Sequence, residues 1–114
     1  MNELLCIARL KIHDGKLDEF KHLAARCVAL VRTKDTGTLQ YDLYFNSENN
    51  ECIIFERYRD SQALLDHRKH LGNTIAAILQ TCSGSGEICG MPSQELIENL
   101  KHSPFQVFAP FKPE

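Results

Sequence analysis

The sequence predicts an α+β domain of the ferredoxin-like type, with the order βαββαβ followed by an extra helix and strand. Two patterns favour this order. Apolar and polar residues alternate in residues 4–13, 38–45 and 51–59, as they do in strands that bury one face. Apolar residues recur at intervals of three and four in residues 17–31 and 63–82, as they do in amphipathic helices.

Length, charge and hydropathy define the class of protein. The 114 residues, 43% of them apolar, predict one domain, residues 1–114, with a core at residues 4–91 and a C-terminal extension at residues 92–114. The formal net charge of −2 argues against a nucleic-acid partner. The chain has no long apolar run and begins without the basic and apolar segments of a secretory signal, so we expect no membrane partner and a cytoplasmic location.

The first strand and the first helix follow from two different periodicities. The strand at residues 4–13 has its more apolar face at Leu4, Cys6, Ala8, Leu10 and Ile12. A turn at residues 13–15 leads into an amphipathic helix whose apolar stripe runs from Leu17 to Val31. The polar residues 34–37 end this helix.

The next two strands are predicted to form an antiparallel hairpin. Residues 38–45 are rich in aromatic side chains, and a polar loop separates them from the return strand at residues 51–59. On the return strand Glu56 and Tyr58 share one face.

The second helix is expected to begin at Asp60, whose carboxylate can accept the free N–H groups of the first turn. Its apolar face contains Ala63, Leu64, His67 and Leu71. Arg68 is expected to point away from that face. Gly72 interrupts the helix, and the apolar stripe then resumes as far as Cys82.

The C-terminal part is predicted to hold a short strand, a helix and a last strand. Residues 83–86, Ser-Gly-Ser-Gly, are expected to be a flexible break before a short strand at residues 87–91. Pro92 suits the first turn of a helix that runs to Lys101. Residues 105–108 alternate like a final strand.

One sheet face is expected to lack a helical cover. It carries apolar and aromatic side chains such as Tyr44, Ile53 and Phe55. Because an apolar sheet face in water costs free energy, we expect a second copy of the chain to cover it and form a homodimer. We also expect residues 105–111 to add an edge strand to the partner's sheet.

Several segments share a pattern with a known family. They are Ala8-Arg9-Leu10, Gly15 to Phe20, Gly37 to Tyr44 (GTLQYDLY), Phe55 to Asp60 (FERYRD) and Ala63 to His67 (ALLDH). From residue 4 to about residue 90 the chain thus resembles the antibiotic biosynthesis monooxygenase family. The resemblance implies a dimeric α/β barrel in which each subunit holds a pocket between sheet and helices. Members include cofactor-independent oxygenases of quinols and polycyclic aromatics, heme-degrading enzymes, and an isomerase of a phosphorylated sugar.

Two departures narrow this range of activities. Heme-degrading relatives use an Asn on the first strand and a Trp, whereas this chain has Ala8 at that strand position and no Trp. Heme degradation is therefore not expected. The sequence also has no glycine-rich phosphate loop, nucleotide fingerprint or metal-ligand spacing, so we expect no cofactor and no metal.

His67 and Glu56 are the candidate catalytic residues. His67 lies on the apolar stripe of its helix, where an imidazole can accept a proton from a phenol or quinol. The alternative is a buried neutral histidine bonded to a strand residue. Glu56 is expected to orient His67 or raise its pKa, and the alternative is a network that only holds the helix to the sheet.

Four further residues are candidates for substrate binding. Tyr41 and Tyr58 can stack on an aromatic ring and donate hydroxyl hydrogen bonds, or can be core residues. Ala8 occupies the pocket position of the first strand. His70 lies one helical turn beyond His67, either at the pocket mouth or exposed to solvent.

The sequence favours a cofactor-independent monooxygenase that oxidises a quinol-like or polycyclic aromatic small molecule with O₂. An alternative is an isomerase of a small phosphorylated carbonyl compound, which Arg9 or another cation in the pocket would favour. A third hypothesis is a non-catalytic small-molecule binding or stress-associated barrel protein. A pocket filled by its own side chains would favour that hypothesis.

Overall fold

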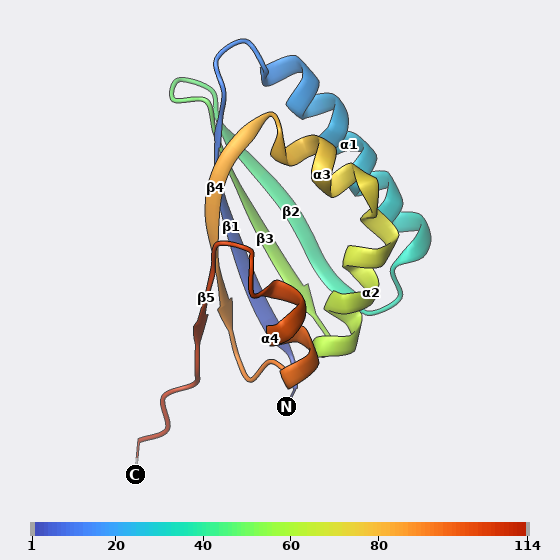
Figure 1. Cartoon of the computed structure of the whole chain (residues 1–114), viewed down its shortest axis with the longest axis vertical. Helices are drawn as coiled ribbons and strands as arrows, with labels where there is room; N and C mark the ends of the chain where they lie inside the picture. Colours follow the sequence, from blue (N-terminus) through green and yellow to red (C-terminus); the bar gives the residue numbers. More distant parts are fainter. Residues whose placement is uncertain (1, 114) are drawn as a thin grey trace.

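The computed structural model describes residues 2–113, so Met1 and Glu114, the ends of the predicted domain, lie outside the described residues. The helices lie together on one side of a twisted sheet (Figure 1). The elements are β1 (Leu4–Ile12), α1 (Leu17–Lys34), β2 (Thr38–Asn46), β3 (Glu51–Tyr58), α2 (Ser61–Leu71), α3 (Asn73–Leu79), β4 (Cys82–Cys89), α4 (Gln94–Leu100) and β5 (Phe105–Phe108). This arrangement confirms the predicted α+β fold with an extra helix and strand.

The sheet has the strand order β2-β3-β1-β4-β5, so the first strand lies at its centre. β1 pairs antiparallel with both β3 and β4. The predicted hairpin of β2 and β3 is present, and its register places Tyr41 opposite Glu56. Because side chains alternate along each strand, Tyr41, Glu56 and Tyr58 all face the helices.

The core between sheet and helices consists of two clusters. One holds Leu4, Tyr58, Leu64 and other residues from β1, β3, α2, β4 and α4. The other is built around Phe20 and Ile12, at the opposite end of β1. Side chains from both clusters reach a space in the middle of the layer, and that space is the site described below.

The second helix begins as the sequence predicts. The Asp60 carboxylate accepts a hydrogen bond from the Ala63 N–H at 2.8 Å, which satisfies one of the free donors of the first turn. Gly72 then separates α2 from α3 with a positive φ of 51°, a conformation that glycine adopts without strain.

The expected flexible break at residues 83–86 is wrong, because these residues lie inside β4. The two glycines of this segment allow close packing. A Cβ at Gly84 would come within 2.3 Å of the Arg9 carbonyl oxygen, and one at Gly86 within 2.5 Å of the Phe105 ring. The missing side chains therefore let β1 and Phe105 approach β4 closely, which a purely local interpretation of Ser-Gly-Ser-Gly does not reveal.

The C-terminal extension folds onto its own subunit. Ser93 caps α4 by accepting the Leu96 N–H at 3.2 Å, and Leu96 and Leu100 are buried. β5 pairs parallel with β4 of the same chain, with Phe105 beside Gly86. Residues 105–108 therefore form the outer strand of their own chain's sheet, and their pairing with a partner's sheet stays a prediction.

The sheet face opposite the helices is uncovered in the subunit (Figure 1). On it Tyr44 is 58% exposed and Leu5 is 37% exposed, and the Tyr44 and Phe55 rings pack edge to face. None of the helices in residues 2–113 has the length and apolarity that crossing a bilayer requires.

Candidate active site

A cavity of about 180 Å³ lies between the sheet and the helices. Its wall is mostly apolar and comes from strands β1 to β4 and helices α1 to α3, together with the C-terminal extension from Leu100 to Phe105. Four large polar side chains interrupt this apolar wall, Tyr41, Glu56, His67 and Arg68, and the two small hydroxyl side chains of Ser85 and Ser103 also line it. An apolar cavity with few convergent polar groups is the usual form of a small-molecule site.

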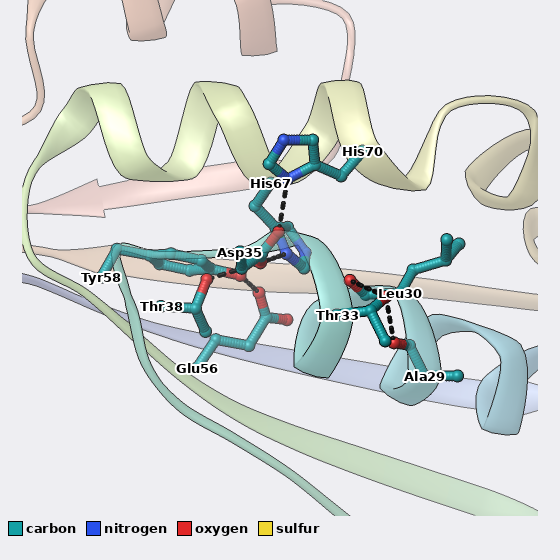
Figure 2. A network of polar contacts seen from close by, with 9 residues as sticks. All are labelled: Ala29, Leu30, Thr33, Asp35, Thr38, Glu56, Tyr58, His67 and His70. Atoms are coloured by element: carbon teal, nitrogen blue, oxygen red, sulfur yellow. Dashed lines mark hydrogen bonds and ion pairs between the residues drawn. The ribbon is translucent and has the colours of Figure 1, made fainter.

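His67 is positioned by Asp35, which follows the last residue of α1. The Nδ1 atom of His67 lies 2.8 Å from Asp35 Oδ2, and both side chains are about 5% exposed or less. Asp35 also accepts hydrogen bonds from Thr38 at 2.6 Å and from His70 Nδ1 at 2.6 Å. Figure 2 shows the two imidazoles reaching from α2 toward the one carboxylate.

The protonation states of this pair follow from the surroundings. Burial alone would raise the pKa of Asp35, but the hydrogen bonds from Thr38, His70 and His67 outweigh it and lower that pKa. Burial lowers the pKa of His67, although Asp35 acts in the opposite direction. At neutral pH the carboxylate is therefore ionised and the imidazole neutral, with its Nδ1–H donating to Asp35.

The second ring nitrogen of His67 is left available. Nε2 has no hydrogen-bond partner. Within residues 2–113, every fully buried side-chain nitrogen or oxygen has a partner, so Nε2 is not fully buried and reaches accessible space. His67 lines the cavity, and the Tyr41 and Tyr58 rings flank its own ring with centroid separations of 5.4 and 5.2 Å. A neutral imidazole held in this way presents a lone pair to the cavity.

Glu56 forms a second polar pair with Tyr58. The Tyr58 hydroxyl donates to Glu56 Oε1, and Tyr58 is fully buried (Figure 2). Burial raises the pKa of Glu56 to about 7, although Tyr58 and Arg68 both act to lower it. Glu56 is half-buried, and the part that remains accessible belongs to the cavity wall. A carboxyl group with this pKa exchanges its proton readily near neutral pH.

The structure brings four of the six predicted site residues to the cavity wall: Ala8, Tyr41, Glu56 and His67. Tyr58 and His70 lie behind the wall instead, where they hold Glu56 and Asp35 respectively. The expected pairing of Glu56 with His67 is replaced by the pairing of Asp35 with His67. The physical reason is the end of α1, which places the Asp35 carboxylate directly against α2.

Two site residues have no counterpart among the predictions. Asp35 is part of a polar segment that ends α1, which on its own is typical of a solvated turn. Arg68 was expected to point away, yet it lines the cavity and donates from Nε to Asn99 Oδ1 of α4 at 2.9 Å. Arg9, the cation that the isomerase hypothesis names, is bound to Glu87 at 3.1 Å and does not line the cavity.

Replacing Glu56 by Gln is expected to change the pH dependence of stability. In the folded protein the pKa of Glu56 is raised from 4.5 to about 7, so folding favours the protonated carboxyl group. The stability that this contributes is fully present below pH 4.5 and is lost as the pH rises to about 7, a loss of up to about 3 kcal/mol. The Gln variant retains an oxygen for the Tyr58 hydroxyl but cannot ionise. Relative to wild type, its free energy of unfolding should therefore increase between pH 4.5 and pH 8.

Urea titrations at several pH values measure this difference. Glu51→Gln is the matched control, because Glu51 is exposed at the start of the same strand and should give a nearly constant difference from wild type. If the free energy of unfolding of Glu56→Gln differed from that of wild type by an amount that does not change with pH, this would contradict the raised pKa of Glu56.

The profile of the antibiotic biosynthesis monooxygenase family matches residues 4–72, which is more than half of the chain. The chain is a member of the antibiotic biosynthesis monooxygenase family. The matched region contains Asp35, Glu56 and His67 but ends before α4. No curated protein matches the sequence. Within residues 2–113, no three His, Cys, Asp or Glu side chains gather as metal ligands would.

Solved structures share the fold of this family member. MupZ from Pseudomonas fluorescens is 22% identical and superimposes with a TM-score of 0.84 over 99% of this chain and 88% of MupZ. Rv0793 from Mycobacterium tuberculosis is 24% identical, with a TM-score of 0.69 over 81% of this chain and 97% of Rv0793. SnoaB from Streptomyces nogalater, a cofactor-independent oxygenase, is 17% identical, with a TM-score of 0.65 over 82% of this chain and 97% of SnoaB.

Proposed function

We propose that this chain is a cofactor-independent monooxygenase that oxidises a quinol-like small molecule with O₂. The observation that carries the proposal is the His67 imidazole, oriented by Asp35 and open through Nε2 to an apolar cavity. Membership of the monooxygenase family and the likeness in fold to the oxygenase SnoaB support the same reaction class.

His67 starts the proposed reaction by accepting a proton. A quinol hydroxyl within hydrogen-bond distance of Nε2 passes its proton to the ring, and the ionised Asp35 stabilises the imidazolium that forms. The electron-rich quinolate then transfers one electron to O₂, and the resulting radical and superoxide combine to form a carbon–oxygen bond. The apolar wall excludes water and favours this recombination within the cavity.

The remaining steps balance without another reactant. The peroxide O–O bond breaks, one oxygen atom stays on the ring, and the other leaves as water. The quinol supplies all four electrons, so that quinol and O₂ yield a hydroxyquinone and water. We assign Glu56 as the acid that protonates the departing oxygen, because burial raises its pKa to about 7 and it lines the cavity.

The cavity volume favours a small ring system. At about 180 Å³ it is close to the roughly 150 Å³ of an apolar cavity that holds one benzene molecule. A single-ring quinol therefore fits inside it, whereas a polycyclic substrate would extend through the opening. We propose a single aromatic ring as the reacting part of the substrate, stacked against Tyr41.

Oxygen uptake tests this function. The purified, metal-stripped protein is given a single-ring hydroquinone or a naphthoquinol, and the uptake caused by autoxidation is subtracted. Autoxidation releases hydrogen peroxide, and catalase converts this peroxide back into half of the oxygen consumed. The proposed reaction releases no hydrogen peroxide, so catalase does not change its oxygen uptake. We expect catalase-insensitive uptake with one hydroxyquinone formed per O₂. Uptake equal to autoxidation with both substrates would reject the function.

A second function is favoured by one observation, the Arg68 side chain in the cavity wall. An isomerase of a small phosphorylated carbonyl compound needs a cation for the phosphate, and His67 and Glu56 would move its protons. Solvent deuterium appearing beside the carbonyl of such a compound, by NMR in D₂O, would identify this activity. A non-catalytic barrel is less favoured, because the cavity is not filled by side chains.

We also propose that the subunits form a homodimer through the uncovered sheet face. Leu5 and Tyr44 expose apolar surface there, and Phe55 lies beside Tyr44. Light scattering at low micromolar concentration should give twice the subunit mass of 13.0 kDa for wild type. A Leu5→Glu/Tyr44→Glu variant should be monomeric, whereas Leu79→Glu, exposed on the helix side, should stay dimeric. A monomeric wild type would contradict the proposal.

A further inference from the structure

Arg68 is the charged side chain of the cavity wall that the proposed mechanism does not use. It is half-buried on α2, and its Nε is fixed by Asn99 of α4 at 2.9 Å. Within the described residues, its two Nη groups have no hydrogen-bond or ion-pair partner. The guanidinium is thus held in place on one side while its other donors remain available.

The surroundings of Arg68 do not neutralise its charge by direct contact. The negative charge of Glu56 favours the charged form of Arg68, but the two side chains form no ion pair. The Glu56 carboxyl group is instead engaged by the Tyr58 hydroxyl. A partly desolvated cation without a bound anion is costly, and an anionic ligand would offset that cost through charge-assisted hydrogen bonds.

The position of Arg68 relative to the catalytic groups defines what it would bind. Arg68 follows His67 in the sequence, and both side chains line the same cavity, so one small ligand can contact both. Planar guanidinium donors match the paired oxygens of a carboxylate or phosphate. Asn99 lies outside the region that matches the family profile, so the anchor of Arg68 comes from the C-terminal extension.

We infer that Arg68, held by Asn99, forms an anion subsite in the cavity, and that the substrate carries a carboxylate or phosphate group beside its reacting ring. This inference deepens the proposed function by defining the substrate class. The anionic group binds to the Arg68 Nη donors, and the ring lies against the apolar wall near His67. The C-terminal extension is then a determinant of specificity as well as a part of the fold.

Binding of single-ring probes tests the subsite without any turnover. Benzoate, phenyl phosphate and neutral benzamide are titrated into ¹⁵N-labelled protein, and amide shifts in α2 and α4 are followed by NMR. We expect both anions to bind wild type at least about tenfold more tightly than benzamide. Arg68→Gln should weaken binding of the anions about 10- to 100-fold and leave benzamide unchanged. Asn99→Ala should weaken binding of the two anions by a smaller factor than Arg68→Gln does.

Lys69→Gln is the matched control, because it removes a positive charge from the neighbouring, exposed position of α2. It should leave all three affinities unchanged. Tighter binding of phenyl phosphate than of benzoate would assign a phosphorylated substrate, and the reverse order a carboxylic acid. Equal affinity of wild type for benzoate and benzamide, or an anion preference that survives in Arg68→Gln, would overturn the inference. Since no O₂ is consumed, this outcome is independent of the oxygen-uptake result.

Discussion

Replacing His67 by Ala is expected to lower the rate of catalase-insensitive oxygen uptake about 10²- to 10⁴-fold, the usual contribution of a general base. The variant loses the cavity-facing Nε2 that accepts the quinol proton, while the cavity itself becomes larger. Substrate binding should therefore persist, and the loss should appear in kcat. Because burial lowers the pKa of His67 below its ordinary value of 6.5, wild-type activity should fall only below that pH as the imidazole becomes protonated.

The oxygen electrode measures this effect with the quinol that wild type oxidises best. His22→Ala is the matched control, because His22 is exposed on α1 and should retain full activity. His67→Gln, which keeps polar volume but cannot act as a base, should be as inactive as His67→Ala. Full activity in either variant would show that another group removes the proton.

Replacing Asp35 by Asn is expected to be the next most damaging change, with a loss of kcat of about 100-fold or more. In serine-protease triads the corresponding Asp to Asn replacement lowers turnover about 10⁴-fold, because the histidine adopts the wrong tautomer. Here an Asn amide would donate where the carboxylate accepts hydrogen bonds from His67, His70 and Thr38. His67 would turn its lone pair toward the amide and present Nε2–H to the cavity.

Asp35 acts through His67, so testing Asp35→Asn requires a measurement whose result would stay the same if Asp35 had only a structural role. Asp35 raises the pKa of His67, and removing its charge should therefore lower that pKa further. The acid limb of the pH–rate profile should shift to lower pH in Asp35→Asn, even though the maximum rate falls. Asp42→Asn, at an exposed position of β2, serves as the control. A reduced rate with an unshifted acid limb would mean that Asp35 only stabilises the fold.

Local sequence patterns were sufficient for most of the fold. Alternation along β1, β2 and β3 predicts which side chains face the helices, since consecutive side chains of a strand point to opposite sides of the sheet. The cap at Asp60 and the stripe that contains His67 depend on the helical repeat alone, and both are present. The uncovered apolar face follows from the same alternation.

The sequence by itself therefore determined the element order, the helix-facing side of the sheet and the placement of His67 beside an apolar site. Only the tertiary structure decided which groups act with His67. Asp35 is 32 positions away in the sequence and meets it because α1 ends against α2, while Arg68 meets Asn99 because α4 packs beside α2. Periodicity reports which face a side chain occupies over one or two turns. The distance between two faces depends on how whole helices pack, and no local pattern contains that information.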